Sequence, residues 1–186
     1  MSDNADRFVV ITGGPGSGKS TLLAALGARG HFCLPEAGRA IIQAQAAIGG
    51  QALPWADRSA FAELMLSWEI RSYHEAETRS GFAFFDRGVP DVAGYLRLIG
   101  LPVPAHVQKA VELYRYRRHV FIAPPWPEIF TQDRERKQDF EEAARTYEAL
   151  AATYAAANYE LIELPRASVA ERVRFILERV LPNGPA

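Results

Sequence analysis

The most informative part of this sequence is residues 13–20, Gly13-Gly14-Pro15-Gly16-Ser17-Gly18-Lys19-Ser20, which directly follow the apolar run 8–11. The stretch satisfies the pattern G-x-x-x-x-G-K-[ST]. Its glycines let the backbone bend sharply and point several N–H groups at one anion, because no Cβ stands in the way. The pattern therefore predicts a loop that binds the phosphates of a nucleoside triphosphate.

The residues that close this loop have the chemistry that triphosphate binding requires. We expect Lys19 to reach the β- and γ-phosphate oxygens and to act in catalysis, and Ser20 to ligate Mg²⁺, with Thr21 beside them in the nucleotide site. A helix-type pattern follows at once, with leucines at positions 22, 23 and 26 among alanines. Its N-terminal dipole would point at the phosphates.

Length and composition favour a single domain, 1–186. The chain has 186 residues, 48% of them apolar, which is enough to bury a substantial core. Its 21 Lys and Arg residues nearly balance 22 Asp and Glu residues, and the arginines are interleaved with acids. Without a long basic run, no nucleic acid is expected as a partner. The four histidines are scattered, which argues against protein-borne zinc.

The sequence also favours one cellular compartment over others. A single cysteine, Cys33, leaves no partner for an intrachain disulfide. The first six residues are polar and acidic, and no apolar run approaches the roughly 20 residues that cross a bilayer. We therefore expect a cytoplasmic protein with no membrane insertion.

Short, almost continuously apolar runs alternate with helix-type patterns along the chain. The expected strands are 7–12, 32–35, 82–86, 119–123 and 159–164, and the expected helices are 19–28, 37–47, 57–78, 90–99, 104–114, 140–156 and 168–180. Such runs are typical of strands covered on both faces, as in a parallel sheet. Since a parallel sheet binds its ligand beyond the carboxyl ends of the strands, the junctions after the strands are expected to form the site.

Two charged residues follow the third expected strand. Asp86 ends the apolar run, where it is expected either to hold Mg²⁺ through water or to accept the proton of an acceptor hydroxyl. The alternative is an aspartate that only caps the next helix. Arg87 is expected to clamp phosphate or position the acceptor, with a surface salt bridge as its alternative.

The second junction offers further candidates. Glu36 and Arg39 are three residues apart and share one helix face, so they either pair with each other or act in the site. In the site, Glu36 competes with Asp86 as general base and Arg39 binds the acceptor. Trp55, in the loop 49–55, is a candidate for contact with the acceptor or an anchor for its own loop.

A densely charged segment after the fourth expected strand is predicted to form a lid at about 125–139. Arg134 and Arg136 within it are expected to stabilise the charge of the transferring phosphoryl group, because a planar cation suits that role. Closure of the lid would exclude water. The alternative is a solvated helix start.

Taken in order, the motifs resemble the nucleoside and nucleotide kinase branch of P-loop proteins, and within it the predicted-ATPase families related to bacterial nicotinamide riboside kinase. The motifs are G-G-P-G-S-G-K-S, P-E-A-G-R, F-F-D-R-G-x-P-D, D-R-E-R-K-Q-D-F-E-E-A and Y-E-L-I-E-L-P. The Asp86-Arg87 pair is similar to the D-R pair of deoxynucleoside and thymidylate kinases. An AAA label sometimes given to such families does not imply a hexameric unfoldase, because no helical lid domain, second region of homology or sensor arginine is recognisable.

The resemblance implies a three-layer α/β fold with a five-stranded parallel sheet in the order 2-3-1-4-5. It also implies a lid that carries Arg134 and Arg136, with Arg134 in contact with the nucleotide. The adenine would lie near Pro165, Arg166 and Ala167. ATP is favoured over GTP, because no N-K-x-D guanine motif is present.

The expected function is an ATP- and Mg²⁺-dependent phosphotransferase whose partner is a small-molecule phosphoryl acceptor, such as a nucleoside, a nucleotide or a related metabolite. The alternative from another class is a nucleotide-dependent switch or ATPase that acts with a protein or lipid partner.

Overall fold

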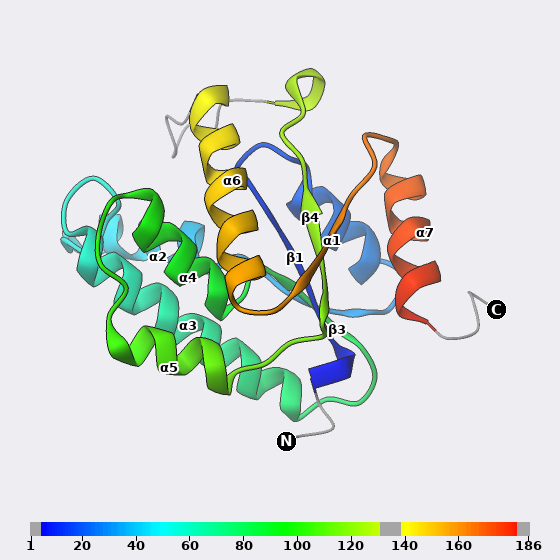
Figure 1. Cartoon of the computed structure of the whole chain (residues 1–186), viewed down its shortest axis with the longest axis horizontal. Coiled ribbons are helices and arrows are strands. Elements are labelled where there is room, and N and C mark those ends of the chain that lie inside the picture. Colours follow the sequence, from blue (N-terminus) through cyan, green and yellow to red (C-terminus); the bar gives the residue numbers. More distant parts are fainter. Residues whose placement is uncertain (1–4, 131–138, 182–186) are drawn as a thin grey trace.

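The computed structural model describes residues 5–130 and 139–181. At its centre is a sheet in the order β2-β3-β1-β4-β5, in which every neighbouring pair is parallel (Figure 1). The strands are β1 (Phe8–Gly13), β2 (Phe32–Leu34), β3 (Ala83–Asp86), β4 (His119–Ala123) and β5 (Glu160–Glu163). The expected α/β fold and its strand order are confirmed.

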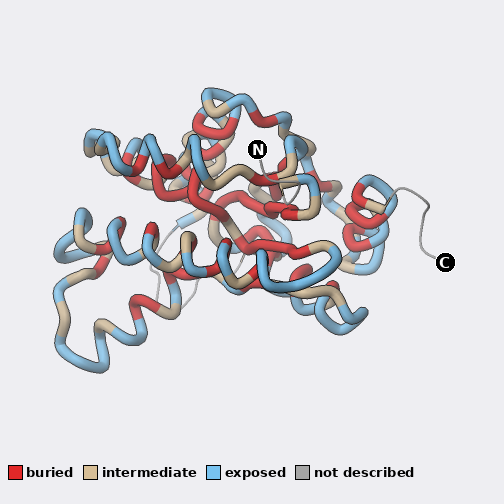
Figure 2. The backbone as a smooth tube through the Cα atoms, turned by 90° about the horizontal axis from the view of Figure 1, so that it is seen from below, coloured by how far each residue is buried: buried red, intermediate tan, exposed pale blue. Residues whose placement is uncertain are grey.

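The sheet is covered on both faces, which is why its central strands are apolar throughout. Every residue of β1 and β3 is buried. Because side chains alternate along a strand, Phe8 and Val10 join one apolar cluster while Val9 and Ile11 join the other. Figure 2 shows this buried backbone running between exposed outer segments.

Helices form the two outer layers (Figure 1). On one face α1 (Lys19–Gly27) and α7 (Val169–Val180) contribute to a single apolar cluster. The other side carries α3 (Arg58–Glu77), α4 (Val89–Leu98), α5 (Ala105–Leu113) and α6 (Phe140–Ala156). Helix α2 (Ala37–Ile48) packs on α3, and two 3₁₀ turns complete the described elements, η1 (Ala5–Arg7) and η2 (Pro127–Ile129).

Side-chain caps set where three of these helices begin. Asp57 accepts a hydrogen bond from the third residue of α3, and Asp139 does the same for α6. Ser168 and Glu171 form a reciprocal capping box at the start of α7. Each cap satisfies a backbone N–H that has no partner within its own helix.

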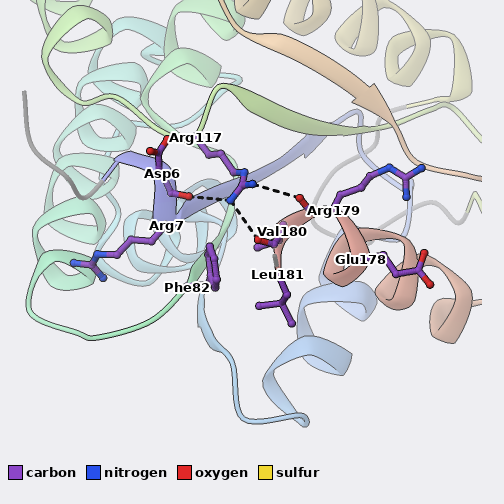
Figure 3. Close-up of a pocket in the computed structure, with 8 residues that line it drawn as sticks. All are labelled: Asp6, Arg7, Phe82, Arg117, Glu178, Arg179, Val180 and Leu181. Carbon is purple, nitrogen blue, oxygen red and sulfur yellow. Dashed lines mark hydrogen bonds between the residues drawn. The ribbon is translucent and has the colours of Figure 1, made fainter. Parts of the chain in front are cut away.

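A hollow of about 400 Å³ opens at the amino ends of the strands (Figure 3). Arg117 lies in its wall and donates hydrogen bonds to the carbonyl oxygens of Asp6, Arg179 and Val180. These bonds join the start of β1 to the end of α7. The hollow is therefore a structural junction, at the end of the sheet opposite the junctions expected to form the site.

Helix α6 packs closely on α4. Gly94 of α4 faces Leu150 of α6 so tightly that a Cβ at Gly94 would lie 2.6 Å from Leu150 Cδ2. Leu150 is 2% exposed. This contact matters for the site, because both helices contribute side chains to it.

We predict that Leu150→Ala lowers the free energy of unfolding by about 2–5 kcal/mol, because it removes buried methyl groups and leaves a cavity between α4 and α6. Leu113→Ala is the matched control, since Leu113 is 62% exposed and its loss should change stability by less than about 0.5 kcal/mol. Denaturant titration followed by tryptophan fluorescence measures both. Equal losses in the two variants would contradict this account of the core.

Candidate functional site

The phosphate-binding loop lies between β1 and α1. Gly13, Gly16 and Gly18 all have positive φ, at 130°, 69° and 79°, a region that other residues seldom adopt. A Cβ on Gly13 would lie 2.5 Å from the carbonyl oxygen of Ala123, and one on Gly14 would lie 2.4 Å from that of Ala143. The loop is therefore wedged between the end of β4 and the start of α6, where only glycine fits.

Lys19 folds back over the loop. Its Nζ donates hydrogen bonds to the carbonyl oxygens of Gly13 and Gly14, at 3.0 and 2.7 Å, and to Ser17 Oγ at 3.3 Å. Burial, followed by repulsion from Arg87, lowers the pKa of Lys19 to about 8, although nearby carboxylates act in the opposite direction. The ammonium group therefore stays mostly protonated at neutral pH.

The first turn of α1 carries the other predicted nucleotide ligands. Ser20 and Thr21 are both exposed there. Ser17 is buried, and its hydroxyl donates to the Gly14 carbonyl oxygen at 2.8 Å. Ser20 and Thr21 thus remain open to a ligand, whereas Ser17 helps to hold the loop together.

Arg172 supports the loop from α7. Its Nη1 and Nη2 each donate to the Ser17 carbonyl oxygen at 3.2 Å, and its guanidinium carbon lies 6.0 Å from the centre of the Trp126 ring. Sequence analysis missed Arg172, although the signal was present: it falls within the apolar stripe of α7, next to Val173, and is 2% exposed.

The predicted adenine edge lies at the same end of the sheet. Pro165, Arg166 and Ala167 form the connection from β5 to α7, just beyond the carboxyl end of β5. The bonds from Arg172 to Ser17 place the first turn of α7, which follows this connection, against the phosphate loop. A role for these three residues in adenine binding stays a prediction.

Asp86 ends β3 beside β1, where it pairs in register with Ile11. It is 4% exposed, and its Oδ1 is sealed from solvent with no hydrogen-bond partner in the described chain. Burial raises the pKa of Asp86 to about 6, against the opposing charge of Lys19. Asp86 is thus a buried carboxyl group that titrates near neutral pH.

The Arg87 side chain joins the connection between β2 and α2 to the start of α4. Its Nε donates to Glu36 Oε1 at 3.1 Å and its Nη1 donates to Asp91 Oδ1 at 3.2 Å. Arg87 therefore forms ion pairs, as the alternative expectation held, but only 14% of its side chain is exposed, so these pairs are not at the surface. Burial alone would lower the pKa of Arg87, but the carboxylates of Glu36, Asp91 and Asp86 raise it. The guanidinium group is therefore firmly charged.

The backbone of Arg87 is strained. Its φ of 77° lies in the left-handed region, which costs a residue with a Cβ about 1–2 kcal/mol. Its N–H nevertheless continues the sheet by donating to the Ile11 carbonyl oxygen at 3.1 Å. Strain of this kind persists where surrounding contacts fix the geometry, here the bonds to Glu36 and Asp91.

Asp91, which sequence analysis did not single out, organises this cluster. It accepts hydrogen bonds from Thr12 Oγ1 at 2.5 Å, Tyr154 OH at 2.6 Å, the Gly88 N–H at 2.9 Å and Arg87 Nη1 at 3.2 Å. These donors come from β1, α6 and the start of α4. The sequence indicates this role only through position: the aspartate follows Gly88 by three residues, at the third position of the helix.

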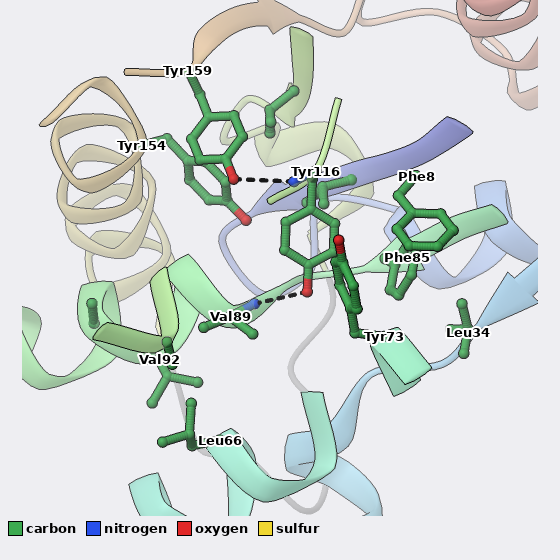
Figure 4. Close-up of a cluster of buried hydrophobic side chains, with 14 of the residues drawn as sticks. Phe8, Leu34, Leu66, Tyr73, Phe85, Val89, Val92, Tyr116, Tyr154 and Tyr159 are labelled. Atoms are coloured by element: carbon green, nitrogen blue, oxygen red, sulfur yellow. Dashed lines mark hydrogen bonds between the residues drawn. The ribbon is translucent and has the colours of Figure 1, made fainter. Parts of the chain in front are cut away.

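Buried aromatic side chains pack around Tyr154, one of the donors to Asp91 (Figure 4). Tyr154 and Tyr159 pack edge to face, and the Tyr159 hydroxyl accepts a hydrogen bond from the Tyr116 N–H. The Tyr116 hydroxyl in turn accepts one from the Val89 N–H, at the first residue of α4. The start of α4, which follows Arg87 and includes Asp91, is therefore held by buried groups.

The remaining predicted site residues are either exposed or outside the described residues. Arg39 is exposed on α2, one turn from Glu36. Trp55 is 61% exposed in the loop between α2 and α3. Arg134 and Arg136 lie outside the described residues, as does most of the predicted lid. The roles of these four residues stay predictions.

Within residues 5–130 and 139–181, no group of three or more His, Cys, Asp or Glu residues could hold a metal ion. No helix in those ranges is both long and apolar enough to cross a membrane.

A glycine-rich loop that joins the central strand of a 2-3-1-4-5 parallel sheet to a helix defines a P-loop NTPase of kinase type. The family model described as an AAA domain matches residues 8–172, so the chain belongs to that family. No curated protein matches the chain.

Solved structures share the fold. A NadR protein in complex with NR has a TM-score of 0.70 at 17% identity, covering 97% of this chain but 53% of that one. Deoxyadenosine kinase from M. mycoides, with dCMP and dCDP bound, has a TM-score of 0.65 at 12% identity, covering 93% and 98%. Shikimate kinase from Acinetobacter baumannii, in complex with shikimate, has a TM-score of 0.57 at 15% identity, covering 95% and 94%. These structures share the fold that the resemblance implies.

We predict that Asp86→Asn changes how stability depends on pH. The folded state keeps the Asp86 proton to a higher pH than the unfolded chain does, so this group lowers stability as pH rises from about 4 to about 6. An asparagine does not titrate, so the variant should gain on the order of 2–3 kcal/mol relative to the parent over that range.

Denaturant unfolding at several pH values between about 4 and 7 measures this difference. Glu112→Gln is the control, because that carboxylate is 66% exposed and its loss should leave the curve parallel to that of the parent. A parallel curve for Asp86→Asn would show that burial does not raise the pKa of this carboxyl group.

Proposed function

We propose that the protein is an ATP- and Mg²⁺-dependent phosphotransferase that acts on a small acceptor, namely a nucleoside, a nucleotide or a related metabolite. The observation that supports this proposal is the position of Asp86, a buried carboxyl group at the carboxyl end of β3, in register with the strand that leads into the phosphate loop. The kinase folds of the similar structures agree with the proposal.

In this proposal the triphosphate lies along residues 13–20. Lys19 would exchange its hydrogen bonds to loop carbonyls for bonds to phosphate oxygens, which are better acceptors because they are charged. Thr21 would add a hydroxyl at the start of α1, and the segment Pro165 to Ala167 would border the adenine. Arg134 and Arg136 of the lid would neutralise charge on the transferring group.

Mg²⁺ fits the donors at this edge of the sheet. The hydroxyl of Ser20 is exposed, and the carboxyl group of Asp86 has no hydrogen-bond partner among the described residues. A cluster of three protein carboxylates is not required, because Mg²⁺ takes most of its remaining ligands from water and phosphate. When bound, the ion would neutralise charge on the β- and γ-phosphates.

We assign the proton transfer to Asp86. Its carboxyl group lies at the carboxyl end of β3, and a pKa near 6 suits a base that works at neutral pH. Oδ2 would take the proton of the acceptor hydroxyl as that oxygen bonds to the γ-phosphorus, and the bond to the bridging oxygen breaks to release ADP. Arg87, held by Glu36 and Asp91, would position the acceptor, with Arg39 and Trp55 at the outer side. If Asp86 instead holds Mg²⁺, Glu36 takes the proton.

A second candidate is a nucleotide-dependent switch with a protein or lipid partner. It is favoured by two exposed apolar side chains near the α2–α3 connection, Ile48 and Trp55, which are 75% and 61% exposed. Slow, acceptor-independent hydrolysis would distinguish the switch from the kinase.

We predict that Mg²⁺-ATP alone yields little ADP and that pooled nucleosides, nucleotides and nicotinamide riboside raise the rate strongly. Lys19→Ala should abolish triphosphate binding, because this lysine supplies the positive charge that would offset the β- and γ-phosphates. Asp86→Asn should keep ATP affinity and lose about 10²- to 10⁴-fold in turnover. Coupled ADP release and equilibrium binding of a fluorescent ATP analogue measure the two effects.

The same assay on Glu36→Gln separates the two carboxylates. Full turnover in Asp86→Asn together with loss in Glu36→Gln would move the proton transfer to Glu36. Tight ATP binding with slow turnover that no pool stimulates would favour the switch, and retained tight binding in Lys19→Ala would overturn the assignment of residues 13–20.

A further inference from the structure

Arg172 on α7 is a buried cation that differs from the other buried charges. Within residues 5–130 and 139–181, five charged side chains are buried: Lys19, Glu69, Asp86, Asp91 and Arg172. The first four share one electrostatic environment around Arg87. Arg172 lies apart from them, since burial alone accounts for the lowered pKa of its guanidinium group. Arginine is seldom buried to this extent unless it is paired, so the position calls for an explanation.

The contacts of Arg172 satisfy its donors only in part. Nη1 and Nη2 both donate to the Ser17 carbonyl oxygen, and Nε is sealed from solvent without a hydrogen-bond partner. No described carboxylate forms an ion pair with Arg172. The Trp126 ring, 6.0 Å away, and the carbonyl oxygen each supply only partial negative charge. A nearby anion would therefore stabilise this cation further.

The guanidinium group lies directly against the phosphate loop. A Cβ on Gly18 would be 2.8 Å from Arg172 Nη1, so the group is beside the residue that precedes Lys19. The Ser17 carbonyl that it binds belongs to the same peptide group as the Gly18 N–H. The described chain has no cis peptide bond, so this N–H points away from Arg172.

This geometry prepares the Gly18 N–H to bind an anion. Hydrogen bonds to the carbonyl oxygen polarise the peptide group and strengthen its N–H as a donor. The Gly18 N–H donates to no described residue. It lies at the start of α1, where unpaired N–H groups favour anions.

A purely structural role would not require a charge at this position. A neutral amide could donate to the Ser17 carbonyl oxygen, and burying a neutral group costs less than burying a cation. The use of arginine therefore favours a role in which its positive charge matters.

We propose that Arg172 is a positioning residue for the triphosphate: it holds the Ser17–Gly18 peptide with its N–H toward the phosphates, and its buried charge favours the more negative ligands. This inference rests on triphosphate binding by residues 13–20, as in the proposed function, and it extends the nucleotide site to α7. Arg172 acts through the peptide group and the field of its charge, because both of its Nη atoms donate to Ser17.

The test compares the parent with three variants. Arg172→Gln keeps an amide donor and loses the charge, whereas Arg172→Lys keeps the charge. Arg174→Gln is the matched control, since it removes a charge from the same helix where the side chain is 63% exposed. The lid arginines are the same in every variant, so the comparison isolates position 172.

Calorimetric titration measures the affinity for inorganic tripolyphosphate, ATP, ADP and AMP, without Mg²⁺ so that ligand charge rises from AMP to ATP. We expect Arg172→Gln to lose about 10- to 100-fold for tripolyphosphate and ATP, less for ADP, and under about threefold for AMP. Arg172→Lys should stay within about fivefold of the parent, and Arg174→Gln should match it. Equal losses for all four ligands, or equal losses in the Gln and Lys variants, would show that Arg172 only braces the loop.

A second measurement uses thermal unfolding. Arg172→Met fills the apolar stripe of α7, and removal of a buried cation offsets the lost bonds to Ser17, so this variant should fold. At a fixed concentration of tripolyphosphate, the unfolding temperature should rise more in the parent and in Arg174→Gln than in Arg172→Met. Equal rises would contradict the role of Arg172. If Arg172→Met does not fold, the Gln and Lys variants decide.

The outcomes separate this inference from the proposed function. Binding losses that do not depend on ligand charge overturn the role of Arg172 and leave the kinase standing. Graded losses without acceptor-stimulated ADP release support the role of Arg172 and overturn the kinase. A parent that binds neither tripolyphosphate nor ATP overturns both.

Discussion

The hydrogen bonds accepted by Asp91 hold the site together. One carboxylate receives donors from Thr12 on β1, Tyr154 on α6, and the backbone and side chain at the start of α4. Without this carboxylate, β1, α4 and α6 would lose their common contact at the carboxyl edge of the sheet. A buried carboxylate with four donors is well satisfied, so this group can be fully enclosed although its neighbours Asp86 and Glu69 are not satisfied in the same way.

That contrast divides the buried charges into two kinds. Asp91 and Arg87 are bonded within the protein, and Arg172 is bonded to the phosphate loop. The carboxyl groups of Asp86 and Glu69 have no hydrogen-bond partner among the described residues, and both have raised pKa values. Groups of the first kind give the site its shape, whereas burial disfavours the charged form of the groups of the second kind.

Much of the fold could be predicted because its signals are local. Continuous apolar runs mark the strands, the glycine pattern marks the loop, and Ser168 with Glu171 marks the start of α7. The sheet order is not a local property, and it followed from the resemblance alone. At the site, Asp86, Arg87 and Glu36 were found because parallel strands bring their carboxyl ends to one edge.

Other parts of the site could not be found in this way, since they depend on contacts between distant segments. Tyr154 meets Asp91 across 63 positions, and Arg172 meets Ser17 across 155. No periodic pattern in the sequence predicts such pairs. Arg172 did carry a weak signal, since it is a charged residue inside an apolar helical stripe. The left-handed backbone of Arg87 has no signal at all, because arginine has no preference for that conformation.

The way Lys19 is held has a consequence for the phosphate loop itself. Its ammonium group donates to two carbonyl oxygens and one hydroxyl of the loop. A single side chain thus closes a ring of hydrogen bonds across residues 13–19, and it keeps a buried cation satisfied. Replacing Lys19 with a shorter side chain would leave two buried carbonyl oxygens short of a donor, so the same residue that carries the charge of the loop also stabilises its conformation.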